Sequence, residues 1–201
     1  MARRRWMALS FALGSACFLI GPFPGYVQLV GASADAVTFF AGSILFTLGG
    51  ALQSWLAWPV RRSQDGGRAA WWSAIIQSAG TLFFNVTTYQ AMHTALTSPD
   101  YDRLVWRPDW RGSICFLVSG VLAYAVAGPR WTRDWWIAAV NLAGCVAFGI
   151  SALAGYVVPS TGSALDLAAA NSWTALGALC FLVGSLLLLP TGRGTRILRS
   201  G

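Results

Sequence analysis

Long apolar stretches alternate with short polar segments along the whole chain, and no charged residue lies near the middle of any stretch. A bilayer core about 30 Å thick is crossed by roughly 20 apolar helical residues, so each stretch is long enough to span it. Because unpaired backbone groups are costly in hydrocarbon, the stretches are expected to be helices. The six predicted spans cover about residues 6–29, 35–59, 70–93, 110–128, 132–158 and 171–190.

The first span is interrupted at Gly21-Pro22-Phe23-Pro24-Gly25. Each proline lacks a backbone donor and clashes with the preceding turn, so we expect the helix to kink or to end early here. A cleaved lipoprotein-like signal reaching Cys17 is the alternative for this span. The apolar residues that follow Cys17 disfavour it, because a lipoprotein would need a polar tether there.

Every span carries one copy of a spaced motif: Gly, a small residue, Phe four positions after the Gly, and a second small residue three further on. Random placement of 22 Gly and 11 Phe in 201 residues would give about one such Gly–Phe spacing, and six occur. The motif residues share one helix face, where small residues let another helix approach closely, so we interpret the motif as a packing seam. The motif positions are Gly14 and Phe18, Gly42 and Phe46, Gly80 and Phe84, Gly112 and Phe116, Gly144 and Phe148, and Gly177 and Phe181.

The motif recurs in alternate spans at intervals of 64 to 70 residues, which predicts three helical hairpins with the same membrane orientation. The expected fold is therefore all-α, an integral membrane bundle of six transmembrane helices in a single domain, residues 1–201. The hairpins are expected at about residues 6–60, 68–128 and 132–191.

Charge placement predicts the orientation of this bundle. The chain is 56% hydrophobic and 10% charged, with a net charge of +7, and most Arg residues fall on one side of the predicted membrane. By the positive-inside rule, both termini are expected on the cytoplasmic side of a bacterial plasma membrane. No soluble face remains for nucleic-acid binding. The Arg residues on the predicted cytoplasmic side are Arg3, Arg4, Arg5, Arg61, Arg62, Arg68, Arg130, Arg133, Arg193, Arg196 and Arg199.

Amide side chains inside the predicted membrane are the first candidates for function. Gln77 and Asn141 each stand three positions before a motif Gly. Gln77 also begins a polar stripe at helical spacing, with Thr81, Asn85 and Thr88. One interpretation is a solute path lined by Gln77, Asn85 and Asn141. The other is hydrogen bonding between helices, which we favour because no charge accompanies the amides.

No cofactor is expected. His93 is the only histidine, and one histidine cannot make a conventional metal site. The cysteines lack the Cys-x-x-Cys spacing of metal or redox sites, so we expect them to pack as small apolar residues. No catalytic triad, phosphate loop or carboxylate pair is recognisable, and we do not expect an enzyme. The cysteines are Cys17, Cys115, Cys145 and Cys180.

The predicted outer segment 94–111 combines both charge signs with two Trp residues. Arg and Trp are enriched at binding hot spots, so one interpretation is a site for a partner protein or lipid headgroups. The favoured interpretation is a structured interfacial cap with internal Arg–Asp pairs. The candidate residues are Asp102, Arg103, Trp106, Arg107, Asp109 and Trp110.

The Gly-Ser-x-x-Phe-x-x-Gly core of the even spans, with Trp58-Pro59 and Arg61-Arg62 after the second, resembles the YrhK-like membrane hairpin of bacteria. The whole chain is similar to actinobacterial integral membrane proteins, in which a segment like 102–109 leads into a Gly-Ser…Phe helix. This resemblance implies no known activity. We therefore expect a non-catalytic component that contacts membrane lipids and acts through helix packing, with itself as a homo-oligomer or with another membrane protein. The alternative is a small channel or facilitator for a neutral or weakly polar solute.

Overall fold

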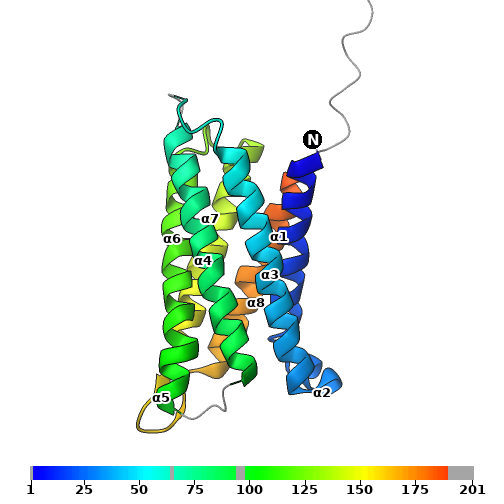
Figure 1. Cartoon of the computed structure of the whole chain (residues 1–201), viewed down its shortest axis with the longest axis vertical. Coiled ribbons are helices and arrows are strands. Elements are labelled where there is room, and N and C mark those ends of the chain that lie inside the picture. The colour runs from blue at the N-terminus through cyan, green and yellow to red at the C-terminus, as the bar shows by residue number, and fades with distance from the viewer. Residues whose placement is uncertain (1, 64–65, 94–97, 190–201) are drawn as a thin grey trace, which may run out of the picture.

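The computed structural model describes residues 2–63, 66–93 and 98–189, and within them the chain is almost entirely helical (Figure 1). The long helices of this part are α1 (Ala2–Ile20), α3 (Ala32–Ala57), α4 (Gly67–His93), α6 (Arg107–Ala125), α7 (Arg133–Ala154) and α8 (Leu167–Leu188). The short elements are α2 (Pro24–Val30), α5 (Ser98–Tyr101), the π-helical turn η1 (Asp102–Trp106), β1 (Val157–Val158) and β2 (Ser163–Ala164).

The six long helices form a closed ring, in which each helix packs against two neighbours. α1 packs with α3, α4 with α6, and α7 with α8; α3 also packs on α4, α6 on α7, and α8 returns to α1. Successive long helices run in opposite directions (Figure 1). The starts of α1, α4 and α7 therefore lie at the same end as the last turns of α3, α6 and α8. We name this the N-terminal end, and the opposite one the α5 end.

The outer surface of the bundle is apolar, whereas small hydroxyl side chains are buried inside it. On α4, Leu82 and Val86 are exposed and Thr81 is fully buried. On α6, Val121 is exposed and Ser119 is fully buried. Apolar residues facing outward and small polar residues between the helices are typical of a bundle packed in lipid.

Three of the described helices, α3, α7 and α8, are each long and apolar enough to cross a membrane. α1 and α2 pass the same test only when taken together as one broken span. α4 contains several amides and hydroxyls, and the first two turns of α6 contain three charged residues, so both are less apolar. Three apolar helices of this length are typical of a membrane protein.

The break in the first span occurs where the prolines predict it. α1 ends at Ile20, and the axis of α2 is bent from it by 91°. Pro24 stands at the start of α2, where its missing N–H is not needed and its fixed φ suits the first turn. The expected early end of the first helix is therefore confirmed.

The fifth predicted span, 132–158, is too long. α7 ends at Ala154, and β1 and β2 then pair antiparallel, with Val157 opposite Ala164. Gly155, a poor helix former, caps the end of α7, and Pro159 favours extended backbone at Val158 just before it. A short hairpin therefore replaces the last turn of the expected helix.

The segment 94–111 is not an irregular connection where the structure describes it. It is helical from Ser98, and its last residues form the first turns of α6. Arg107 pairs with Asp102 at 2.9 Å, and the five-residue separation matches the wider turn of the π-helical η1. Residues 94–97 lie outside the described residues, as do Arg193, Arg196 and Arg199 of the charge count.

Candidate functional site: a vestibule ending at an aromatic plug

The motif Gly of each long helix faces the motif Phe of the helix paired with it. A Cβ atom added at Gly144 would lie 2.8 Å from the Phe181 ring, and Gly177 faces Phe148 in return. The same reciprocal contacts join α1 to α3 and α4 to α6. The packing seam predicted from the motif is therefore present inside the ring, within a single copy of the chain.

The motif Phe rings meet inside the ring in two layers, which together we name the aromatic plug. One layer consists of Phe18, Phe84 and Phe148, with ring centroids 5.9 to 6.5 Å apart. The other consists of Phe46, Phe116 and Phe181, with centroids 5.7 to 6.4 Å apart. All six side chains are buried, and a space of only about 10 Å³ remains among five of them, all except Phe181. This is room for one water molecule at most, so the plug closes the middle of the bundle.

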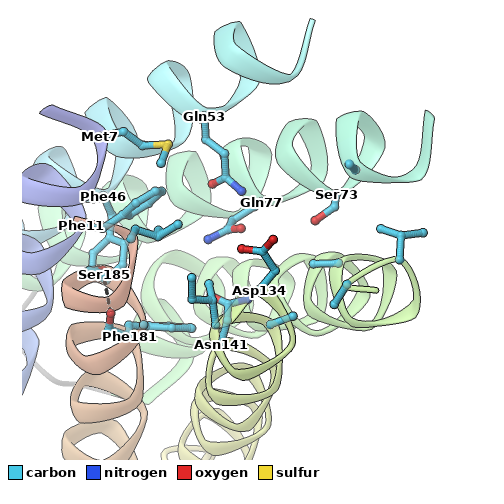
Figure 2. A pocket seen from close by; sticks show the side chains of 18 residues that line it. Met7, Phe11, Phe46, Gln53, Ser73, Gln77, Asp134, Asn141, Phe181 and Ser185 are labelled. Carbon is cyan, nitrogen blue, oxygen red and sulfur yellow. Dashed lines mark hydrogen bonds between the residues drawn. The ribbon is translucent and has the colours of Figure 1, made fainter. Parts of the chain in front are cut away.

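A cavity of about 310 Å³ lies between the plug and the N-terminal end, and we name it the vestibule (Figure 2). Residues from all six long helices line it, and Phe46 and Phe181 of the plug form its inner end. Small-molecule sites in proteins occupy about 300 to 1,000 Å³, so the vestibule has room for a small solute. Its polar lining residues are Gln53, Ser73, Gln77, Asp134, Asn141 and Ser185.

Three of these side chains, Gln53, Gln77 and Asp134, point toward one another from α3, α4 and α7 (Figure 2). Gln77 is buried, and its Oε1 accepts a hydrogen bond from Ser119 Oγ at 3.2 Å. The Oε1 atom of Gln53 is shielded from solvent and has no hydrogen-bond partner among the described residues. Asp134 lies in the first turn of α7, where it is exposed at the mouth of the vestibule.

The serine hydroxyl groups that line the vestibule already donate hydrogen bonds to backbone carbonyls of the protein. Ser73 Oγ donates to the carbonyl of Ser119 at 2.9 Å, and Ser185 Oγ donates to the carbonyl of Phe181 at 2.6 Å. The Asn141 amide nitrogen lies 3.8 Å from the sulfur of Cys145, which is a weak acceptor. The capacity left for a ligand therefore lies in the amide groups and the carboxylate.

Two of the three residues of the predicted path come together in the vestibule, Gln77 and Asn141. Asn85 is not among the lining residues. Its Nδ2 atom instead donates to Thr47 Oγ1 of α3 at 2.9 Å. The other members of the polar stripe, Thr81 and Thr88, donate to backbone carbonyls of their own helix. Of the stripe on α4, only Gln77 therefore lines the vestibule, while Asn85 contacts α3 and the two Thr hydroxyls bond within α4.

Replacing Asn85 by Leu is expected to lower the stability by less than about 1 kcal/mol and to leave solute binding in the vestibule unchanged. One interhelical hydrogen bond in a membrane protein contributes about 0.6 kcal/mol, and removal of the unpartnered Oδ1 offsets part of that loss. Thermal unfolding in mild detergent and a ligand-binding titration measure the two effects. Gln77→Leu serves as the comparison, since it removes an amide that does line the vestibule. Loss of binding in Asn85→Leu alone would contradict this assignment.

The candidate residues near the α5 end form a packed cap. Trp106 Nε1 donates to the carbonyl of Ala152 at 2.8 Å, which ties η1 to α7. The Trp106 ring lies 4.9 Å from the Tyr156 ring and is stacked with Trp110 at 6.3 Å. Thr87 Oγ1 of α4 donates to the backbone just before it, at Val105. The Trp106 side chain therefore packs η1 against α6 and the end of α7.

Four charged residues of this cap form two ion pairs. Besides the Arg107–Asp102 pair, Arg103 lies 3.9 Å from Asp100. Arg103 and Arg107 remain 70% and 56% exposed, so their guanidinium groups are accessible to anionic headgroups. Asp109 stands in the first turn of α6 and is half-buried. The sequence interpretation of a cap with internal Arg–Asp pairs agrees with these contacts.

The remaining candidate groups form no ligand cluster. His93 Nδ1 lies 2.9 Å from the carbonyl of Tyr89, at the end of α4. The four cysteines are free thiols, and Cys145 belongs to the buried core. Within the part of the chain that the structure describes, no group of three His, Cys, Asp or Glu side chains could hold a metal ion.

Four polar lining residues were missed by the sequence interpretation: Gln53, Ser73, Asp134 and Ser185. For Gln53 and Asp134, the distance from the motif contains the signal. In antiparallel neighbours, residues before the motif on one helix lie level with residues after the motif on the next. Gln53 follows Phe46 by seven residues, while Asp134 precedes Gly144 by ten. Both residues therefore lie on the side of the plug that faces the N-terminal end.

No family model matches the chain, and no curated protein or solved structure shows significant similarity to it. The vestibule and the aromatic plug are therefore the features of the molecule from which its function is inferred.

Proposed function

We propose that the chain crosses a bacterial plasma membrane six times, as three hairpins with both termini in the cytoplasm. The less apolar helices, α4 and α6, support this proposal because they occupy the ring between α3 and α7 and turn apolar residues outward. The basic residues Arg3 and Arg61 lie at the N-terminal end, stacked over Trp55 and Trp58. Trp is typical of either membrane interface and an excess of Arg is typical of the cytoplasmic one, which supports a cytoplasmic location for the N-terminal end.

Within this bundle, the vestibule binds a small and weakly polar solute, and the protein acts as a small-solute facilitator. The observation that carries this proposal is the cavity of about 310 Å³, which is lined by all six long helices and ends at the plug. A binding cavity enclosed by the helices of a membrane bundle is a usual place for a ligand site. With the plug closed, solute reaches the vestibule from the cytoplasmic side only. Passage across the membrane requires the Phe rings to separate.

A role in association with a second copy or another membrane protein has less support. The Gly and Phe residues that suggested it face one another inside the ring. Association would then have to use the lipid-facing surface or the cap at the α5 end. The vestibule is a more specific feature, since it collects amides and a carboxylate from three helices in one place.

Filling the vestibule tests the proposed solute site. Ala138 is buried and lines the vestibule, whereas Ala139, the next residue, does not line it. Ala138→Leu is expected to weaken binding of 2-phenylethanol by about tenfold or more, because the added side chain takes the space of the ligand. Ala139→Leu, the matched control, is expected to leave binding unchanged.

Ligand-observed NMR on the purified full chain in mild detergent measures both variants. The control also removes the contribution of 2-phenylethanol that partitions into the detergent, since that contribution is the same in both. Equal binding by the two variants would contradict a solute site in the vestibule.

A further inference from the structure

We propose that the vestibule selects a small organic cation, an ammonium ion carrying an apolar body. This inference rests on the solute site proposed above and names the chemical class of its ligand. It is carried by the charge of the lining, by the hydrogen-bonding capacity left open there, and by the aromatic inner end.

The first step concerns charge. Asp134 is the only charged side chain among the lining residues that the structure describes. Basic residues are present at the same end, but none of them is among the lining residues, and two of them have partners elsewhere. Arg133 donates to the carbonyl of Leu187 at 2.9 Å and to that of Leu189 at 2.7 Å, at the C-terminal end of α8. Arg61 donates to the carbonyl of Trp58 at 2.6 Å. An anionic ligand would therefore meet the Asp134 carboxylate, whereas a cation is attracted to it.

The second step concerns hydrogen bonds. The Asp134 carboxylate accepts hydrogen bonds and cannot donate them. Gln53 Oε1 is a second acceptor, shielded from solvent and without a partner in the described chain. A buried acceptor without a donor is costly, so a ligand that donates to it gains binding free energy. An ammonium group donates up to three hydrogen bonds, an alcohol donates one, and a carboxylate donates none.

The third step concerns the body of the ligand. Beyond the polar groups, the vestibule is lined by Met7, Phe11 and Ile137 and ends at Phe46 and Phe181. These side chains favour an apolar ligand body, and the faces of Phe rings also attract cations. One carboxylate matches one positive charge. The vestibule thus fits a monovalent amine with a small hydrocarbon or aromatic body.

Three probes with closely related skeletons test this selectivity: 2-phenylethylammonium, 2-phenylethanol and phenylacetate. Binding to the purified full chain is measured at neutral pH by isothermal titration calorimetry. We expect the ammonium to bind about tenfold more tightly than the alcohol, since a charge-assisted hydrogen bond adds about that much. Phenylacetate is expected to bind more weakly than either.

Asp134→Asn keeps the shape of the side chain and removes its charge. It is expected to abolish the preference for the ammonium while leaving the affinity for 2-phenylethanol unchanged, which also shows that the variant is folded. Asp134→Glu is expected to keep the preference. Asp100→Asn, which removes one carboxylate near the α5 end, is the matched control and should bind all three probes as the unmodified chain does.

The outcomes separate the two proposals. Equal binding of the alcohol and the ammonium, or a preference that survives Asp134→Asn, would overturn the cation proposal. The solute site would stand in that case if Ala138→Leu still blocks 2-phenylethanol. If Ala138→Leu weakens the binding of none of the three probes, both proposals are overturned.

Discussion

Replacing Gly144 by Ala is expected to destabilise the folded protein by about 1 to 3 kcal/mol, because the new methyl group has no space. Its Cβ atom would lie 2.8 Å from a ring carbon of Phe181 and 3.1 Å from the carbonyl oxygen of Gly177. The ring is held by the other members of the aromatic plug, and the carbonyl belongs to the backbone of α8. Neither can move away without opening the contact between α7 and α8.

The same change at Gly149, on the same helix, is the matched control. Nothing lies within 4 Å of a Cβ atom added there. Ala is expected to stabilise the protein at this position by up to about 1 kcal/mol, since it lowers the backbone entropy lost when the helix forms. Unfolding in mild detergent with increasing dodecyl sulfate, followed by circular dichroism, measures both variants. Changes of the same sign and size would show that the seam does not depend on close approach at the motif Gly.

The packing of neighbouring helices could be predicted from the sequence because its causes are local. The Gly–Phe spacing of four residues places both groups on one face, which is enough to predict close approach at Gly144 and the other motif positions. The prolines at 22 and 24 predict the break after α1 for an equally local reason. Gly155 and Pro159 together could have predicted that α7 ends before residue 158, but the apolar residues between them made the span look longer.

The vestibule could not be predicted in the same way, because it depends on how all six helices close into a ring. The packing of α8 against α1 closes that ring, and it joins helices from the two ends of the chain. A local pattern does not contain that contact. The sequence therefore identified individual polar residues without showing which of them share a cavity.

Helix geometry explains why the polar stripe of α4 was only partly informative. At about 100° per residue, Asn85 is rotated by about 80° from Gln77 and lies about 12 Å further along the axis. Gln77 therefore reaches the vestibule, while Asn85 reaches Thr47 of α3. Asp134 was missed for another reason, since it stands at the start of the predicted span 132–158, ten residues before the motif Gly. The first turn of α7 brings it to the vestibule mouth.

Shortening Phe46 to Ala is expected to have a larger effect than any other single change at the vestibule. Phe46 is 4% exposed and is the residue that borders both the vestibule and the space within the plug. Removing its ring is expected to cost about 3 to 5 kcal/mol of stability. It also joins the two spaces, so the vestibule extends into the middle of the bundle.

Phe84→Ala is the matched control, because Phe84 is equally buried but belongs to the other layer of the plug and does not line the vestibule. Both variants are expected to lose similar stability, as measured by unfolding in detergent. Only Phe46→Ala is expected to speed glycerol entry into vesicles that contain the protein, measured by stopped-flow light scattering at a temperature where both variants remain folded. If the two variants admit glycerol equally, or neither does so faster than the unmodified chain, the layer that contains Phe46 is not by itself the barrier on the solute path. An increase confined to Phe46→Ala would place that barrier at the inner end of the vestibule.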